Sequence, residues 1–155
     1  ALNRISESKL GSKFFLERKF KTWITPHSRE FSRLFPQMQF DNNIELAIKA
    51  AKEFNISILL KGANSVVADE KNAWQLFGTD SQTARAGLGD LLSGFVAGCS
   101  AIDLAFRGNI TTESFAKFAL LHSFAASNCK KGSNASAIGD ELSKLMRNLK
   151  MRQIS

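Results

Sequence analysis

The sequence predicts an α/β domain in which a layered sheet is flanked by helices. Three observations predict this class. Apolar residues recur at helical spacing over 42–54, and the apolar run ISILL follows at 56–60. Two β-prone segments, 65–69 and 73–77, flank the polar turn EKN. Beyond Asp90 the pattern is helical in three successive segments. A helix, a buried strand and a hairpin in this order fit a layered architecture.

The chain opens with residues of helical character, and the first predicted strand is TWIT at 22–25. Pro26 ends this strand because proline forces extended geometry on its predecessor. A short helix is predicted over SREFSRLF, residues 28–35, and Pro36 ends it. The segment TPHSREF therefore lies where a strand passes into a helix.

The helix over 42–54 is expected to begin at Asp41, because aspartate is a favoured N-cap residue. Its apolar side chains share one helical face: Ile44, Ala47, Ile48, Ala51 and Phe54. The run at 56–60 shows little polar alternation, which is typical of a central parallel strand buried on both faces. KGAN then turns the chain into the hairpin.

Three helices are predicted in the second half of the chain. The first covers 90–107. Thr111 and Thr112 are expected to cap the second, which runs to about Asn128. The third is predicted near 138–150, where leucine and isoleucine recur at helical spacing.

The 155 residues carry a formal charge of +7, which lies at the two ends of the chain. Residues 1–21 and 130–155 each hold six basic and two acidic side chains, whereas residues 22–129 hold nine and ten. The phenylalanines fall in apolar segments and do not alternate with lysine or arginine. This distribution argues against a nucleic-acid groove, so we expect no nucleic-acid partner.

Cys99 and Cys129 are thirty residues apart and form no CxxC pair, so neither a zinc site nor a disulfide framework is indicated. The apolar runs are far shorter than the ~20 residues that span a bilayer, and no leader sequence opens the chain. The sequence therefore predicts a cytoplasmic protein with no membrane partner.

The stretch RAGLGDLLSGFVAG, residues 85–98, holds the strongest candidate site. Gly87 and Gly89 precede or open a helix, where backbone N–H groups and the helix dipole favour an anion such as a phosphate. Asp90 could take a proton from a hydroxyl within hydrogen-bond reach. The alternative is that Asp90 is merely an N-cap and the glycines are ordinary loop residues.

Two loops at strand ends are further candidates, because ligands of open α/β sheets gather there. His27 follows the first strand, and the alternative is that it is a solvated loop residue. Lys61, Gly62 and the Ser65 hydroxyl follow the buried strand, and the alternative is a simple turn into the hairpin. His122 lies on an apolar helix and is interpreted as a hydrogen-bonded core histidine.

Taken in order, TPHSREF, LLKGANSVVAD, GLGDLLSG and LLHSFAASNCKKGSNASAIGDEL resemble the motifs of the ADP-dependent NAD(P)H-hydrate dehydratase family, which has a ribokinase-like fold. The family patterns read roughly TPHPGE, LKGAxT, GGTGDVLAG and HxxAAD. In that family an Ala-Leu-Asn follows Asp-Ala-Asp near mid-domain, and this chain opens with Ala-Leu-Asn. The resemblance covers nearly the whole chain and implies that residues 1–155 form one partial ribokinase-like domain, without its first strands.

The resemblance implies an enzyme that uses ADP to repair hydrated NADH or NADPH, releasing AMP and phosphate. Asp90 would activate the substrate hydroxyl and bind the substrate, and His27 would face the hydrated nicotinamide. Magnesium and a homo-oligomeric assembly are implied as well. The residues implied to hold ADP are Lys61, Gly62, Ala63, Asn64, Ser65, Gly87 and Gly89.

Six residues at four sites depart from the family patterns. Ser28-Arg29 replaces Pro-Gly, and Ser65 replaces a threonine. Arg85-Ala86 stands where Thr-Gly is common, and Leu88 replaces the threonine between the two glycines. These last changes remove a hydroxyl and a glycine, which could weaken phosphate contacts.

Two other functions stay open at this point. One is a kinase of the same fold that uses ATP to phosphorylate the alcohol of a vitamin precursor. The other is a non-catalytic fragment that folds or binds only with a partner or as an oligomer, because missing strands leave a sheet edge open.

Overall fold

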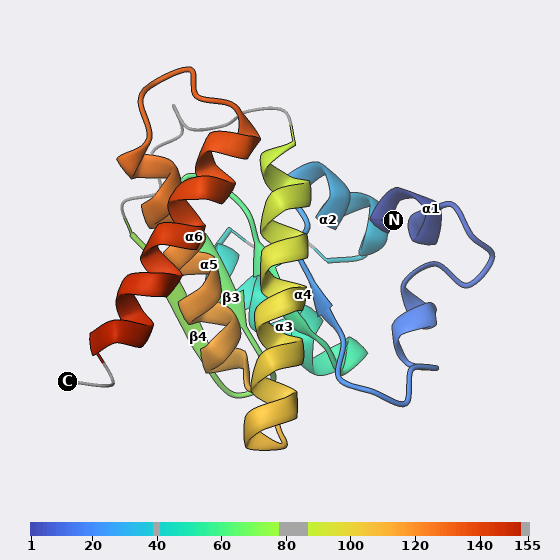
Figure 1. Cartoon of the computed structure of the whole chain (residues 1–155). Coiled ribbons are helices and arrows are strands. Elements are labelled where there is room, and N and C mark those ends of the chain that lie inside the picture. Colours follow the sequence, from blue (N-terminus) through green and yellow to red (C-terminus); the bar gives the residue numbers. More distant parts are fainter. Residues whose placement is uncertain (39–40, 78–86, 153–155) are drawn as a thin grey trace. The chain divides into compact units, whose positions relative to one another are not determined.

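The computed structural model describes residues 1–38, 41–77 and 87–152. The chain divides into two compact units, Ala1–Phe77 and Gly78–Ser155. The first unit holds a sheet with helices, and the second holds three long helices (Figure 1).

The first unit begins with two short helical segments, α1 (Leu2–Ser6) and the 3₁₀ helix η1 (Gly11–Phe15). A short strand, β1 (Trp23–Ile24), then leads through Pro26 into α2 (Ser28–Leu34). Both elements fall inside the ranges that the sequence predicts.

Three further strands complete a four-stranded sheet in the order β1-β2-β3-β4: β2 (Ser57–Leu60), β3 (Ser65–Ala68) and β4 (Ala73–Leu76). Strand β2 pairs in parallel with β1 and antiparallel with β3. All four side chains of β2 are buried. The prediction of a central strand is confirmed, and the sheet around it is mixed because β3 returns directly as part of the hairpin.

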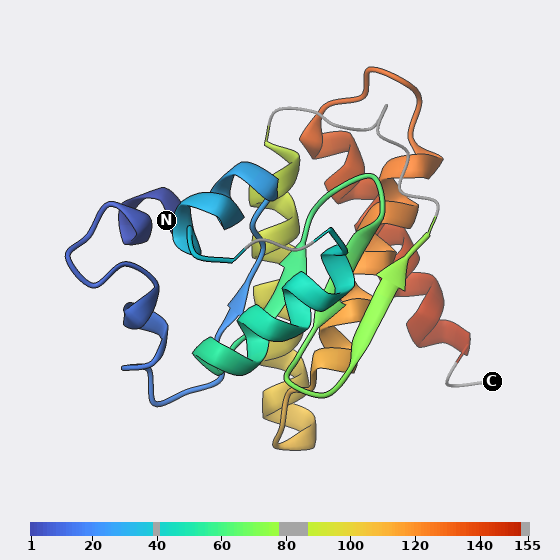
Figure 2. The ribbon, with the colours of Figure 1, turned by 180° about the vertical axis from the view of Figure 1, so that it is seen from behind.

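Helix α3 (Asn43–Phe54) contacts β2, β3 and β4 and covers one face of the hairpin side of the sheet (Figure 2). Asn42 is its N-cap, and the Asn42 side chain accepts a hydrogen bond from the Ile44 N–H at 2.9 Å. The expected cap, Asp41, is therefore wrong by one residue. Asn55 ends the helix in a left-handed conformation, which asparagine tolerates better than most residues.

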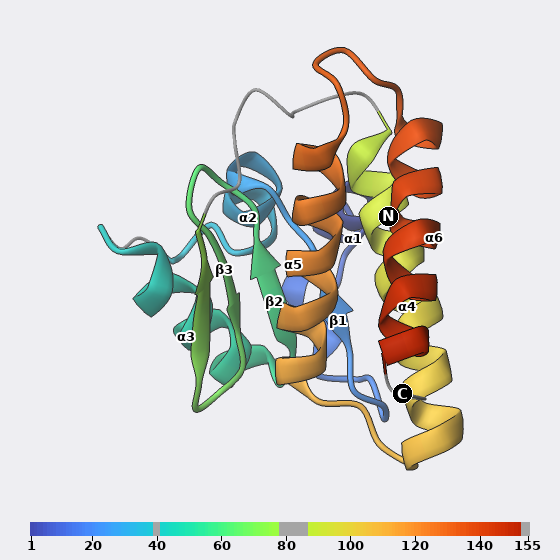
Figure 3. The ribbon, with the colours of Figure 1, turned by 60° about the vertical axis from the view of Figure 1, so that its left-hand side comes forward.

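The hairpin of β3 and β4 is closed by Asp69. Its carboxylate accepts hydrogen bonds from the backbone N–H groups of Lys71 and Asn72 at 2.9 and 2.8 Å. The register pairs Ser65 with Leu76 and Ala68 with Ala73. Figure 3 shows this hairpin beside β2. The hairpin predicted from the EKN turn is confirmed.

The second unit consists of α4 (Leu88–Arg107), α5 (Thr112–Asn128) and α6 (Ala135–Arg152). The three helices pack pairwise on one another (Figure 1). Thr111 caps α5 as predicted, through a hydrogen bond from the Ser114 N–H at 3.1 Å. The last helix begins three residues before the predicted start, because the Asn134 side chain accepts a hydrogen bond from the Ala137 N–H.

Helix α4 is long and apolar, and much of it is open to solvent. Its most apolar stretch has a mean hydropathy of 1.4, and 17% of that stretch is buried. Ile102 and Phe106 are 55% and 86% exposed. By length and composition alone α4 could cross a membrane. A core helix of a protein that never meets a membrane passes the same test, so this finding assigns no location.

Candidate nucleotide and substrate site

The two loops that the sequence selects at strand ends lie next to each other in the first unit. Strands β1 and β2 are parallel, so their carboxyl ends lie at the same edge of the sheet. Beyond them His27 and Lys61 form a parallel bridge, and the Lys61 N–H donates to the Pro26 carbonyl at 2.8 Å. The structure therefore brings His27 together with the start of the KGAN loop.

His27 is the N-cap of α2 and forms a capping box with Glu30. Its Nδ1 accepts a hydrogen bond from the Glu30 N–H at 3.2 Å, and Glu30 Oε2 accepts one from the His27 N–H at 2.9 Å. The side chain remains 52% exposed. The sequence interpretation missed this role of His27. The signal for it in the sequence is Glu30, three residues after His27. The same spacing marks capping boxes that begin with serine or threonine.

The loop after β2 is closed by a side chain. Ser65 Oγ accepts a hydrogen bond from the Gly62 N–H at 3.3 Å and donates one to the Gly62 carbonyl at 3.1 Å. Gly62, Ala63 and Asn64 are exposed, whereas Ser65 is 8% exposed. The Ser65 hydroxyl, which the sequence suggests is available for a ligand, is thus engaged in shaping the loop. The exposed surface of this loop is the segment from Gly62 to Asn64.

Helix α4 begins without a side-chain cap. Gly87 is its N-cap in a left-handed conformation, with φ of 81° and ψ of −10°. The other long helices of the described residues begin with a side chain that accepts from the first turn: Asn42 for α3, Thr111 for α5 and Asn134 for α6. Among the described residues, therefore, no cap side chain competes for the first-turn N–H groups of α4. This arrangement suits an anion.

Asp90 lies in the first turn of α4 and is exposed. The alternative interpretation, that Asp90 is the N-cap, is wrong because Gly87 occupies that position. A carboxylate in the first turn still interacts favourably with the helix dipole. Asp90 is thus a solvent-facing acid directly beside the first-turn N–H groups.

Leu88, which departs from the family pattern, is partly buried. It packs against the buried cluster of Ala125, Ala126, Ile138 and Leu142 on α5 and α6. The larger side chain therefore contacts the helical core. Arg85 and Ala86, the other two departures in this motif, lie outside the described residues.

His122 on α5 is a core residue, as the sequence predicts. It is 5% exposed and its imidazole interacts with the backbone carbonyl of Leu88. Burial lowers the pKa of His122 to about 4, and the hydrogen bond to Leu88 acts in the opposite direction. The imidazole is consequently neutral near pH 7. Its Nε2 is buried and has no hydrogen-bond partner among the described residues.

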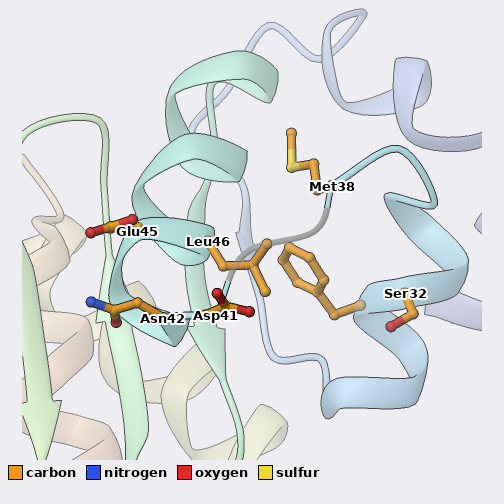
Figure 4. Close-up of a pocket in the computed structure, with 7 residues that line it drawn as sticks. Ser32, Met38, Asp41, Asn42, Glu45 and Leu46 are labelled. Atoms are coloured by element: carbon orange, nitrogen blue, oxygen red, sulfur yellow. The ribbon is translucent and has the colours of Figure 1, made fainter.

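The described residues contain no group of three or more His, Cys, Asp or Glu side chains that could hold a metal ion. A hollow of about 670 Å³ lies between α2 and α3, lined partly by Ser32, Met38, Asp41 and Glu45 (Figure 4). None of the predicted site residues lines it. The predicted residues form two groups instead: His27 with Lys61–Ser65 in the first unit, and Gly87, Gly89 and Asp90 in the second.

Known proteins that are similar to this chain belong to the family that its motifs resemble. A family model described as NAD(P)H-hydrate dehydratase matches residues 1–148. The ADP-dependent (S)-NAD(P)H-hydrate dehydratase of Nitrosopumilus maritimus is 37% identical over 78 residues, which are 48% of this chain and 27% of that protein. The bifunctional NAD(P)H-hydrate repair enzyme of Synechocystis sp. is 33% identical over 111 residues, 68% of this chain and 21% of that protein.

Solved structures show the same fold. A ribokinase-like superfamily protein of Enterococcus faecalis superposes with a TM-score of 0.72 at 23% identity, over 90% of this chain and 49% of that one. The ADP/ATP-dependent NAD(P)H-hydrate dehydratase of Bacillus subtilis, co-crystallised with ATP and Mg²⁺, gives a TM-score of 0.62 at 19% identity, over 85% and 49%. The ribokinase-like prediction is confirmed, and the chain spans about half the length of these structures.

Proposed function

Because the chain belongs to the NAD(P)H-hydrate dehydratase family, we propose that it carries out, or contributes half of the domain for, the ADP-dependent dehydration of hydrated NADH and NADPH. The products would be NAD(P)H, AMP and phosphate. The observation that carries this proposal is the start of α4. A helix that begins on a left-handed glycine, without a side-chain cap and with an acid in its first turn, suits phosphoryl transfer to a hydroxyl.

The proposed reaction has two stages. Asp90 takes the proton of the substrate hydroxyl, whose oxygen bonds to the terminal phosphorus of ADP while the bond from that phosphorus to AMP breaks. The phosphate group of the resulting ester then leaves with the electron pair of the C–O bond, and a ring C–H proton passes to water as the ring double bond is restored. Asp90 is exposed and so can reach a substrate hydroxyl.

The remaining predicted residues would bind and orient. The first-turn N–H groups at Gly89 and Asp90, with Gly87 before them, would hold the phosphates of ADP. The exposed backbone of Gly62, Ala63 and Asn64 and the Lys61 ammonium would contact the nucleotide. His27, adjacent to Lys61 and 52% exposed, would face the nicotinamide.

Magnesium would enter with the nucleotide. Mg²⁺ commonly binds through one or two carboxylates together with substrate phosphates, so it needs no cage of protein ligands. The absence of a three-ligand cluster in the described residues is compatible with this mode, and Asp90 is the carboxylate beside the proposed phosphate position. When bound, the ion would neutralise charge on the phosphates.

The same family membership supports three further proposals. The two compact units form one partial ribokinase-like domain. The protein acts on small molecules in the cytoplasm, without a nucleic-acid or membrane partner. It assembles as a homo-oligomer, to which the exposed apolar residues of α4 would contribute.

The test is restoration of the near-ultraviolet absorbance of NADH from hydrated NADH, with ADP or ATP and Mg²⁺. We expect restoration by the native chain, and a loss of roughly 10²–10⁴-fold in turnover for Asp90→Asn, which keeps the side chain's size but removes its basicity. Phosphorylation of a vitamin-precursor alcohol without any NADH would instead identify the ATP-dependent kinase of the same fold.

A second function is favoured by a specific observation. Ile102, Leu104 and Phe106 on α4 are all more than half exposed, and the chain spans about half of its solved neighbours. A half-domain that binds a complementary partner would cover such a face. Co-expression with the first half of the dehydratase domain from Nitrosopumilus maritimus tests this. A heterodimer that restores NADH where this chain alone does not would support the second function.

A further inference from the structure

One buried polar group in the second unit plays no part in the chemistry above. His122 lies on α5 and is 5% exposed. Its imidazole interacts with the backbone carbonyl of Leu88, the first residue of α4. Leu88 stands between Gly87 and Gly89, so the imidazole contacts the backbone of the proposed phosphate site from the interior of the unit.

A histidine at this place is costly for the fold. A neutral imidazole has one N–H donor and one acceptor nitrogen, and a carbonyl can satisfy only the donor. The Nε2 atom is buried without a hydrogen-bond partner among the described residues. An apolar side chain of similar volume would fill the same space without an unsatisfied nitrogen. Packing alone therefore gives no reason for an imidazole here.

The neighbourhood of Leu88 supplies a reason. The Leu88 side chain packs against Ala125, Ala126, Ile138 and Leu142. Gly87 stands in a left-handed conformation, and a glycine is free to move away from it. The side-chain packing fixes one side of the Leu88 backbone, and a hydrogen bond to its carbonyl fixes the direction of the peptide unit that joins Leu88 to Gly89. That peptide carries the Gly89 N–H.

We propose that His122 is a positioning residue: its hydrogen bond to the Leu88 carbonyl holds the first turn of α4, and with it the Gly89 and Asp90 N–H groups, in the orientation that binds phosphate. This inference rests on the proposed function for its ligand. The contact itself belongs to the ligand-free protein and can be tested without any ligand.

The first experiment compares His122→Leu with the native chain by amide hydrogen exchange of Leu91, whose N–H donates to the Gly87 carbonyl at 2.9 Å in the first turn of α4. We expect exchange at Leu91 to rise roughly three- to tenfold in the variant, as the loss of one neutral hydrogen bond predicts. We expect the melting temperature to change little, because the variant removes an unsatisfied buried nitrogen and one hydrogen bond together. Unchanged exchange at Leu91 would overturn the proposal, whatever the protein's activity.

Two amide variants test for rescue. Because Nε2 has no partner among the described residues, Nδ1 is the nitrogen that donates to the Leu88 carbonyl. An asparagine amide reaches about as far as Nδ1 of histidine, and a glutamine amide about as far as Nε2, so His122→Asn should restore native exchange and His122→Gln should not. Failure of His122→Asn, with His122→Leu also destabilised, would mean that His122 only fills space.

The second experiment measures binding of ADP with Mg²⁺ by calorimetry. His122→Leu should weaken binding roughly three- to tenfold, and the rescuing amide should recover it. The matched control is Ala119→Gly, one turn earlier on α5 and also buried, which should lower stability without changing ADP affinity. If the native chain binds no ADP, the proposed function fails, and the exchange data still decide the role of His122. An equal loss of ADP affinity in Ala119→Gly would overturn the positioning role of His122.

Discussion

The left-handed conformation of Gly87 allows a stability test in which one chemical change has opposite effects at two places in the same helix. Gly87 has a φ of 81°, and a Cβ added there would lie 3.6 Å from the Ala135 Cβ, an ordinary contact. The strain of Gly87→Ala is therefore conformational, and a non-glycine residue in the left-handed region costs roughly 1–2 kcal/mol. Gly94 lies within the helix, and nothing is within 4 Å of its added Cβ. Gly94→Ala should stabilise by about 0.5–1 kcal/mol.

Both substitutions restrict the unfolded chain equally, so that contribution cancels in the comparison. The free energies of unfolding of the two variants should differ by roughly 2 kcal/mol, with Gly87→Ala the less stable. Urea denaturation of both variants and the native chain measures this difference, provided that the slopes agree. A Gly87→Ala protein as stable as Gly94→Ala would refute the assignment of Gly87 as a left-handed cap. Gly87→Asn should lie between them, because asparagine tolerates this conformation.

Three further predictions concern single side chains. The folded-state pKa of His122, about 4, lies below its ordinary value of 6.5, so the unfolded chain binds the proton first. The free energy of unfolding should be highest above about pH 6.5 and should fall by up to about 3 kcal/mol as the pH falls to about 4. In the His122→Leu variant, the free energy of unfolding should depend less on pH over this range. Thr111→Ala removes the cap of α5 and should cost about 1 kcal/mol in urea denaturation, whereas Thr111→Ser should cost little. Burial and the Asp103 carboxylate raise the pKa of the Cys99 thiol, so a thiol reagent should label Cys99 slowly. In the Cys99→Ser variant, the labelling rate of Cys129 should be the same as in the native chain.

Local patterns in the sequence predicted most of the fold. Helix α3, the buried strand β2 and the β3–β4 hairpin each follow from periodicity and turn residues within about a dozen positions. The errors lie at helix ends, where competing acceptors stand side by side. Asp41 and Asn42 are both good caps, and the choice of Asn42 depends on which side chain reaches the Ile44 N–H.

The sequence predicted which motifs belong to the candidate site, but not which of their residues lie next to each other in space. The sequence selected His27 and the loop after β2 separately, and their adjacency needs the parallel pairing of β1 with β2. The engagement of the Ser65 hydroxyl with Gly62 depends on a turn whose geometry no residue pattern fixes. The contact of His122 with Leu88 joins two residues more than thirty positions apart on consecutive helices, which is beyond the reach of local periodicity.

The capping box at the start of α2 limits what His27 can do. Its Nδ1 accepts the Glu30 N–H, so this nitrogen carries no hydrogen and the hydrogen of the neutral ring sits on Nε2. In this state His27 can donate its Nε2 hydrogen to a ligand that competes with Glu30 Oε2, which lies 3.5 Å from Nε2. The ring cannot accept a proton, because its one lone pair already accepts the Glu30 N–H. A carbonyl or carboxamide oxygen is the kind of group that it would recognise. To act as a base, the ring would first have to give up its bond to Glu30 and leave α2 without its cap.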